Sequence, residues 1–329
     1  MMSTNNIVIS GMRPSGRIHL GNYNGVIKNW INLQNQYDCF FFIADIHALT
    51  TNFNYIYNLN KRSKKILIEW VASGINYKKS TIFIQSHIPE IFELNILLSM
   101  ITNIARLERI PSYKMEKQNN NIYGFLGYPI LQASDILILN AKYVPVGEDQ
   151  IPHIEFVKEI VKKINNNFLN NSTFKFNEPV ALLHDHSKVF GNDGSKMSKS
   201  KNNSILISNS GKILKKKINQ YITDSNKIYK NQPGIPDNCY VWSLHKIYTF
   251  NNEKIYIKKS CLLGNIGCVD CKNILFNNIE KENIKLIKNI KFYEKKEKYI
   301  NDLIIANTKK VRSIAKIILK KFKHNLNLL

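Results

Sequence analysis

Short apolar runs alternate with longer amphipathic segments through the first half of the chain. The runs have the length and continuous apolar character of strands buried on both faces; they span residues 6–10, 39–44, 81–85 and 143–146. The other segments carry apolar side chains every three or four positions, the spacing of one helix face; they span residues 21–37, 58–74, 90–107, 123–140 and 150–164. This alternation predicts a doubly wound α/β fold, in which helices cover both faces of a parallel, Rossmann-like sheet.

The pattern changes at about residue 209. Apolar residues then recur only at helical spacing, as at Ile213, Ile218 and Ile222, and no alternating strand pattern follows. We therefore predict two domains, a Rossmann-like domain over residues 1–205 and an all-helical domain over residues 206–329 that ends in a basic helix at 308–323. The Asn-rich segment 165–177 is predicted to be a surface loop, and residues 182–204 are predicted to lack regular structure.

Composition narrows the class of protein further. With 329 residues, of which 44% are hydrophobic, the chain can build a real core. No apolar run reaches the length of a membrane span, and the first residues do not resemble a secretory signal, so we expect a cytoplasmic protein without a membrane partner. The formal net charge of +23 favours a polyanionic partner such as nucleic acid. Lys, Asn and Ile are abundant throughout, however, so this charge is only mild support.

The first apolar run leads into a glycine-rich turn, behind which a helix opens. Residues 11–22 read Gly-Met-Arg-Pro-Ser-Gly-Arg-Ile-His-Leu-Gly-Asn. His19 and Asn22 place two polar groups at the helix start, Gly21 leaves room for a ligand against the backbone, and Arg13 adds a positive charge. Ligands of α/β sheets bind beyond the carboxyl ends of the strands, and free N–H groups at a helix start favour anions. The turn is therefore a candidate phosphate site.

A second candidate is the loop at residues 194–200, Gly-Ser-Lys-Met-Ser-Lys-Ser. Its two lysines, Lys196 and Lys199, stand three apart among small hydroxyl residues, in a segment with little reason to be buried. Such a loop can close over a polyanion, although taken alone it is more typical of a solvated surface loop.

Together the two segments resemble the signatures of the class I aminoacyl-tRNA synthetases. His-Leu-Gly-Asn at 19–22 is similar to the His-x-Gly-His pattern with Asn in the last place, and Lys-Met-Ser-Lys-Ser at 196–200 is identical to the second pattern. Within the class, the chain resembles the bacterial tryptophanyl enzymes over nearly its whole length; the closest segments are 11–22, 40–51, 124–139, 144–150 and 196–200. The Asn22 amide can still donate a hydrogen bond to a phosphate.

The resemblance implies that tryptophan is activated by ATP with Mg²⁺ and then transferred to tRNA(Trp). Such chemistry needs positioning and charge stabilisation, which agrees with a sequence that shows lysines rather than paired carboxylates. The implied catalytic residues are Lys114, Lys196 and Lys199. The resemblance places ATP against Arg13, Pro14, Ser15, His19, Gly21, Asn22, Gly147, Glu148, Asp149, Val189, Lys196, Met197, Ser198, Lys199 and Ser200. Of these, residues 147–149 would hold the ribose. The alternative interpretation of Lys114 is that it is an ordinary surface lysine without a catalytic role.

The implied amino-acid pocket centres on Asp135. A carboxylate on an otherwise apolar helix is costly unless paired, and the indole N–H needs an acceptor; a helix cap or ion pair is the alternative reading. Tyr128 and Gln150 would bind the amino-acid head group, with His47 close by. The related tyrosyl enzymes are the main competitor, but they place a tyrosine where this chain has Ile9. Because an unpaired buried acceptor rejects phenylalanine strongly, no editing domain is expected.

Four cysteines cluster in the predicted helical domain, at Cys239, Cys261, Cys268 and Cys271. In an intracellular chain such a cluster is more typical of metal binding than of disulfides, and zinc or an iron–sulfur cluster could use the four thiolates. Some bacterial tryptophanyl enzymes have a 4Fe–4S cluster at similar spacing, so the resemblance favours iron and sulfur, with structural zinc as the alternative.

The resemblance also implies a homodimer that binds tRNA(Trp) through its C-terminal helices. Lysines of the last helix could contact phosphates, and a solvated face explains them equally well. Two further readings stay open at this point. A non-catalytic tRNA-binding paralogue would be expected to have lost His19, Lys196 or Lys199, and another nucleotidyltransferase would lack Asp135 and the helical tail.

Overall fold

A five-stranded parallel sheet forms the centre of the protein. The computed structural model describes residues 6–116, 122–183 and 189–328. The strands are β1 (Ile7–Met12), β2 (Asp38–Ile43), β3 (Thr81–Ile84), β4 (Tyr143–Val146) and β5 (Val180–Leu183), in the spatial order β3-β2-β1-β4-β5. Every pairing is parallel. β5 corrects the sequence prediction, which began an irregular segment at residue 182; residues 184–188 lie outside the described part.

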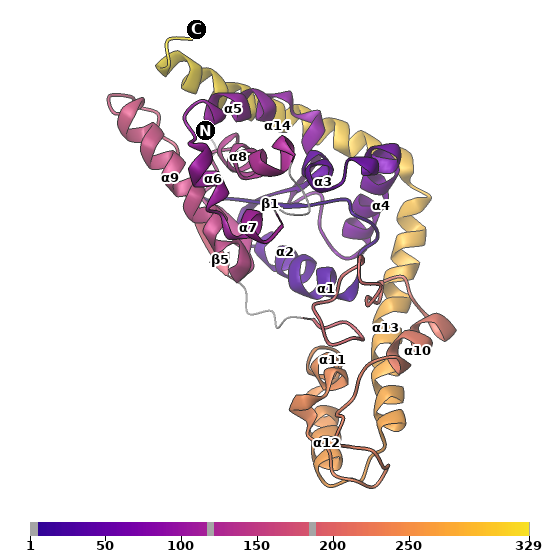
Figure 1. Cartoon of the computed structure of the whole chain (residues 1–329). Coiled ribbons are helices and arrows are strands. Elements are labelled where there is room, and N and C mark those ends of the chain that lie inside the picture. The colour runs from indigo at the N-terminus through magenta and orange to yellow at the C-terminus, as the bar shows by residue number, and fades with distance from the viewer. Residues whose placement is uncertain (1–5, 117–121, 184–188, 329) are drawn as a thin grey trace.

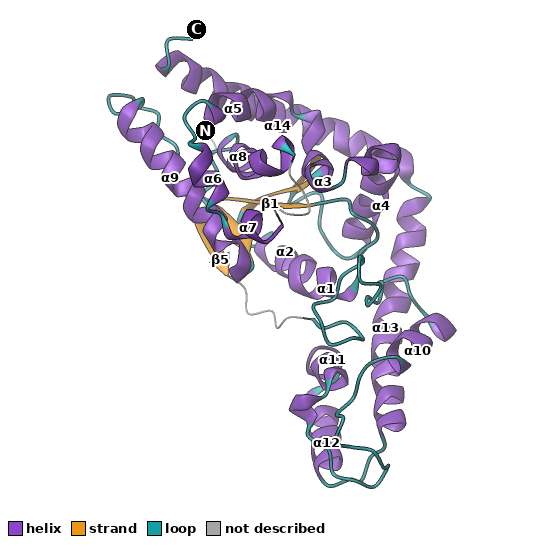
Figure 2. Ribbon diagram, in the orientation of Figure 1, coloured by secondary structure: helices purple, strands orange, loops and turns teal. Residues whose placement is uncertain are grey.

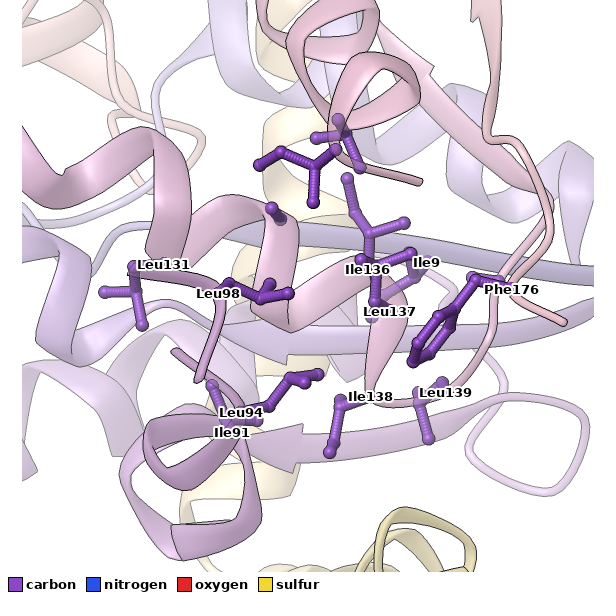
Figure 3. Packing of buried hydrophobic residues seen from close by; sticks show 14 of the residues in the cluster. Ile9, Ile91, Leu94, Leu98, Leu131, Ile136, Leu137, Ile138, Leu139 and Phe176 are labelled. Carbon is purple, nitrogen blue, oxygen red and sulfur yellow. The ribbon is translucent and has the colours of Figure 1, made fainter. Parts of the chain in front are cut away.

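Alternate residues of each strand enter two different cores, which confirms that the sheet is covered on both faces. Ile7, Ile9 and Phe40 belong to one apolar cluster, whereas Val8 and Phe41 belong to the other. The first cluster packs against α5 (Pro89–Ser99), α8 (Tyr123–Leu137), α9 (Ile151–Asn167) and the end of the chain. The second packs against α2 (Lys28–Leu33) and α4 (Leu59–Ala72). Figure 3 shows Ile9 of β1 with Ile136 and Leu137 of α8 in the first cluster.

Several helices differ in their bounds from the sequence prediction. The first is continuous from α1 (Leu20–Asn22) through a π-helical turn, η2 (Tyr23–Ile27), into α2. The segment predicted as one helix at 90–107 is divided into α5 and α6 (Ile104–Glu108), because Asn103 caps a new helix by accepting a bond from the Ala105 N–H. The remaining short elements are α3 (Asp45–Thr51), η3 (Phe53–Asn58), η4 (Gln85–His87), α7 (Pro111–Glu116) and η5 (Glu148–Gln150).

All the regular elements that the structure describes in the C-terminal part are helices, as predicted. Its elements are α10 (Gly211–Asn219), η6 (Pro236–Asn238), α11 (Tyr240–Tyr248), α12 (Asn251–Leu262), α13 (Cys268–Glu294) and α14 (Glu297–Asn325). In Figure 1, α11 and α12 lie away from the sheet, and α13 leads back toward it. Figure 2 shows the strands gathered in the other part of the molecule, with none beside α11 and α12.

The last helix returns to the sheet. α14 begins at Glu297, earlier than the predicted start at 308, and Val311, Ile318 and Phe322 belong to the first apolar cluster. Two of its basic side chains are engaged there, since Arg312 pairs with Glu90 at 3.0 Å and Lys310 donates to Thr81 at 2.9 Å. The division at residue 205 stays a prediction. In the residues that the structure describes, no helix is long and apolar enough to cross a membrane.

The strand order fixes where a ligand can bind. The chain runs outward from β1 through β2 to β3 and then crosses to β4 on the other side of β1. The strand order therefore reverses between β1 and β4. In open α/β sheets this topological switch point, at the carboxyl ends of the strands, is the usual binding crevice.

Candidate active site

The loop after β1 presents His19 at the start of a helix. His19 is the N-cap of α1, and its Nδ1 accepts a hydrogen bond from the Asn22 N–H at 3.2 Å. Because Nδ1 is an acceptor, the imidazole proton must lie on Nε2, which can donate to a ligand. Burial, with a smaller effect of the Lys199 charge, lowers the pKa of His19 to about 4. The ring is therefore neutral at pH 7.

The lysine loop lies directly against this first loop, as the two signatures require. The Leu20 N–H donates to the Ile205 carbonyl at 2.8 Å, and the Ile207 N–H donates to the Ile18 carbonyl at 3.1 Å. A Cβ on Gly21 would stand 2.9 Å from His19 Nδ1 and 3.4 Å from Met197 Cβ. A larger residue at position 21 would therefore require the His19 ring to shift, and Met197 of the lysine loop lies at contact distance.

Within the lysine loop, Lys196 and Lys199 have different surroundings. Lys196 is exposed, whereas Lys199 is half-buried and its Nζ donates to the Gly16 carbonyl at 2.7 Å. Burial lowers the pKa of Lys199 to about 8, although the charge of Glu69 opposes this change. Between the two lysines, Met197 is buried in the second core and its N–H donates to the Val189 carbonyl.

Asn203 holds the lysine loop in shape and was missed by the sequence analysis. Its side chain is 2% exposed. Its Oδ1 accepts from the Ser198 N–H at 2.7 Å, and its Nδ2 donates to Asp193 and Ser195. Ser198 and Ser200 join through their hydroxyls at 2.9 Å. The pattern gave no signal for Asn203, because asparagine is common throughout this sequence.

A cavity of about 270 Å³ opens at the switch point. It lies just below the range of about 300–1,000 Å³ that is typical of small-molecule sites. β1 contributes Ile9, Ser10 and Gly11, β4 contributes the wall from Val144 to Val146, and Asp135 and Gln150 also reach it. The cavity is thus mainly apolar and has few polar groups. Ile9, Asp135, Gly147 and Gln150 were all predicted for the site.

Asp135 is the buried acceptor of this cavity. It is 2% exposed, and desolvation raises its pKa while the bonds from His47 and Gln85 oppose the shift. His47 Nε2 lies 2.8 Å from Oδ2, and Gln85 Nε2 lies 2.8 and 2.9 Å from the two carboxylate oxygens. Gln85 Oε1 accepts from the His47 backbone N–H at 3.3 Å. That bond fixes the amide orientation, so Gln85 can only donate to Asp135.

Gln85 was also missed by the sequence analysis. It follows β3 directly and is fully buried. A polar residue at the carboxyl end of a buried strand is a signal for a ligand site in an α/β sheet. The partner, however, is 50 residues away in the sequence, and only the folded structure brings the two together.

Tyr128 belongs to a neighbouring polar cluster. Its hydroxyl lies 2.5 Å from Ser112 Oγ and 3.1 Å from His153 Nε2, and its ring centroid is 6.5 Å from that of His47. Ser112 is on α7 and His153 is on α9, so one hydroxyl connects three helices. Burial lowers the pKa of His153, with the Asp149 charge opposing. Neither Ser112 nor His153 was predicted.

Comparison with known proteins decides the family. The model of the tRNA synthetases class I (W and Y) matches residues 2–282. The chain belongs to this family. It is 39% identical to the tryptophan–tRNA ligase of Thermotoga maritima, covering 98% of this chain and 99% of that one. It is 35% identical to the tryptophan–tRNA ligase of Aquifex aeolicus, again over 98% and 99% of the two chains.

A solved structure shows the same fold over the full length. The tryptophanyl-tRNA synthetase of Campylobacter jejuni, in a crystal structure complexed with ADP and tryptophan, superposes with a TM-score of 0.87 at 31% identity. The match covers 98% of this synthetase and 100% of that chain. The Rossmann-like class I fold predicted from the sequence is therefore confirmed.

The other residues predicted to bind ATP make fewer contacts with the two signature loops. Arg13 donates to Thr51 Oγ1 at 3.3 Å, Pro14 is buried and Ser15 is exposed. Glu148 and Asp149 are exposed on η5, beside the cavity. A Cβ on Gly147 would stand 2.8 Å from Asp149 Oδ1. Lys114 is exposed on α7, and its side chain has no hydrogen bond to a described residue of the cavity.

The four cysteines of the helical part approach one another. All are half-buried free thiols. Burial raises the pKa of Cys271 to about 12, and the other three thiols add to the effect. Cys271 Sγ also lies 3.3 Å from His245 Nε2. Among the described residues, no group of three or more His, Cys, Asp or Glu side chains could hold a metal ion.

Proposed function

We propose that this synthetase ligates L-tryptophan to tRNA(Trp) at the expense of ATP. The central observation is the buried Asp135 carboxylate in an apolar cavity at the switch point, beside the two class I signatures. The tryptophan–tRNA ligases among its relatives support this substrate. Ile9 offers no polar partner for a tyrosine hydroxyl, which argues against the tyrosyl alternative.

Tryptophan recognition would rest on the indole N–H, which can only donate. Gln85 donates to both oxygens of Asp135, and His47 Nε2 donates to Oδ2 when it carries the ring proton; the carboxylate then acts as an acceptor and can receive one more donor from the cavity. Phenylalanine would leave that acceptor position unfilled, a penalty that can reach about four or five decades where a site is built for such a bond. Gln150 and Tyr128 would bind the amino-acid head group at the other end.

In the first step, the tryptophan carboxylate attacks the α-phosphorus of Mg-ATP and pyrophosphate leaves. Lys196 and Lys199 would neutralise the charge that builds up on the leaving pyrophosphate. The His19 Nε2–H and the Asn22 amide would donate to phosphate oxygens, and Lys114 would approach the α-phosphate. The exposed carboxylates of Glu148 and Asp149 would accept bonds from the ribose hydroxyls.

In the second step, a ribose hydroxyl at the tRNA 3′ end attacks the carbonyl carbon of the adenylate, and AMP leaves. The helices α10–α14 form the part that would bind the tRNA, and the net charge of +23 favours this polyanion. On α14, Lys310 and Arg312 are bound to protein groups. The neighbouring exposed lysines Lys309 and Lys316 are better candidates for phosphate contacts.

A homodimer is proposed as the working form. Large apolar side chains are exposed on the consecutive helices α5–α7, including Ile96, Met100, Ile104 and Met115. Such a group of exposed apolar residues is typical of a protein–protein interface. Sedimentation equilibrium should give twice the chain mass at micromolar concentration, and a monomer at that concentration would contradict this proposal.

For the four cysteines we propose a structural 4Fe–4S cluster. The other three thiols raise the pKa of Cys271, which supports a group shared by all four cysteines. The ligation reaction transfers no electrons, so the cluster would have a structural role. Iron and sulfide analysis of anaerobically purified protein should find about four of each per chain, and zinc without iron would refute this.

The experiment that tests the function is ATP–pyrophosphate exchange with each of the twenty amino acids. Exchange should depend on tryptophan. Exchange with tyrosine alone would support a tyrosyl enzyme, and a complete lack of exchange would support a non-catalytic paralogue.

A further inference from the structure

A buried carboxylate stands behind the contact between the two signature loops. Glu69 is on α4 and is 1% exposed. Its Oε1 accepts from Arg17 Nε at 2.6 Å, and its Oε2 accepts from the Ile18 N–H at 2.8 Å. Both oxygens are therefore bound by the two residues that immediately precede His19.

A carboxylate in this place needs a reason beyond stability. Desolvation raises the pKa of Glu69, and the bonds from Ile18 and Arg17 oppose that shift. Replacing a buried ion pair by apolar residues is often neutral or stabilising. The neighbouring positions of α4, such as Ile66 and Trp70, are buried and apolar, so an apolar side chain would be compatible with this surface.

The loop that Glu69 holds is the one on which Lys199 docks. Lys199 Nζ donates to the Gly16 carbonyl at 2.7 Å, one residue before Arg17. Gly16 has φ +135°, and a Cβ there would stand 3.2 Å from Lys199 Cδ. Residues 16–18 therefore have the lysine loop on one side and Glu69 on the other.

We propose that Glu69 is a positioning residue for adenylate formation. It fixes the backbone of residues 16–18 as the docking site of Lys199, and its negative charge keeps the Lys199 ammonium protonated until ATP arrives. Lys199 then leaves the Gly16 carbonyl for the phosphates of ATP. This inference rests on the role proposed above for Lys199.

The charges around Lys199 set the direction of the test. Burial lowers the pKa of Lys199 to about 8, the charge of Glu69 raises it, and the charge of Arg62 lowers it. His19 also faces Lys199 but is neutral at pH 7. Of these three influences on Lys199, only the charge of Glu69 favours the ammonium form, and a neutral residue at position 69 would remove it. The pKa of Lys199 should then fall below about 8, and less of the enzyme would have the charged lysine at pH 7–8.

The test is the pH dependence of kcat/KM for ATP in pyrophosphate exchange, which reports groups of the free enzyme. In Glu69→Gln, the alkaline loss of activity should move down by about one pH unit. At pH 8 the charged fraction of Lys199, and with it kcat/KM for ATP, should fall about fivefold, while KM for tryptophan stays unchanged. The matched control is Glu90→Gln, because Glu90 is also a buried carboxylate paired with an arginine, Arg312, but lies away from the loops. Its profile should not move.

Arg17→Met provides a test of the opposite sign. This substitution removes the positive charge that partly neutralises Glu69, so Glu69 should raise the pKa of Lys199 further. The alkaline loss of activity in the pH profile should then move to higher pH. This variant also keeps the proposal testable if Glu69→Gln does not fold. The inference would be overturned if the alkaline loss of activity did not move in Glu69→Gln or in Arg17→Met, or if it moved in the same direction in both variants.

Lys199→Met separates the inference from the proposed function beneath it. If Lys199→Met loses most of its activity while Glu69→Gln keeps the wild-type profile, only the positioning role fails. If Lys199→Met keeps full activity, the proposed role of the lysine itself is wrong.

Discussion

The two ends of the proposed active site are built in different ways. At the amino-acid end, Asp135 and Gln85 are buried and bonded to each other before any ligand arrives. At the ATP end, Lys196 is exposed and Lys199 is docked on a backbone carbonyl that it must leave to reach a phosphate. The buried Asp135 and Gln85 side chains can distinguish one amino acid from another without moving. The two lysines can reach a phosphate only if their loop moves.

This difference indicates a division of work. A buried acceptor whose partners are fixed distinguishes ligands by the cost of leaving it unpaired. Positive charges on a loop can approach the phosphates as negative charge develops, and they then stabilise the transition state more than the ground state. Variants of the ATP end should therefore change the rate, and variants of the amino-acid end should change the choice of substrate.

The largest effect is expected from Lys196→Ala. Loss of one charge that acts mainly in the transition state should lower kcat for adenylate formation by about 10²–10³, with little change in the affinity for ATP. Single-turnover adenylate formation and equilibrium binding of ATP would measure the two quantities. Equal losses in both would show that the loop only holds substrate, and would remove the contrast between the two ends.

A smaller effect is expected from Gln85→Met. It removes the donor that holds both oxygens of Asp135, so KM for tryptophan should rise about tenfold while KM for ATP stays the same. Gln34→Met is the control, because Gln34 is also a buried glutamine, bonded to Ser80 and Asn76 away from the cavity. A similar rise in KM for the control would mean that both substitutions act through general destabilisation.

No effect on activity is expected from Arg312→Met. Glu90 is 6% exposed and would lose its partner on α14, so the free energy of unfolding should fall by about 1–2 kcal/mol. This is less than for a fully buried pair, because the Arg312 side chain is 39% exposed. Urea denaturation would measure the loss. Unchanged stability would show that the contact between α14 and the sheet contributes little.

The sequence predicted those parts of the fold and site that depend on local pattern. Continuous apolar runs identified four strands, and β5 was missed because Val180–Leu183 is short and incompletely buried. Asp135 was identifiable as a carboxylate on an apolar helix. Glu69 and Gln85 carried comparable signals, a carboxylate on an apolar helix face and a polar residue at the end of a buried strand, but their roles depend on partners that only the folded chain brings near. Asn203 gave no signal, because asparagine is common throughout the sequence. The interruption between α5 and α6 was missed because Met100, Ile101 and Ile104 continue the apolar pattern across it.

The most direct test of the account is discrimination against a tryptophan isostere in which sulfur replaces the indole N–H. The ratio of kcat/KM for tryptophan to kcat/KM for this isostere would be measured in pyrophosphate exchange, with the wild type and with Asp135→Asn. The wild type should prefer tryptophan by about tenfold or more, the smallest penalty expected when a hydrogen bond to a charged group is lost. In Asp135→Asn, the oxygen would face the Gln85 amide and the NH₂ would face the indole, so the ratio should fall at least tenfold. Equal ratios in the two proteins would contradict the assignment of Asp135 as the group that reads the indole N–H.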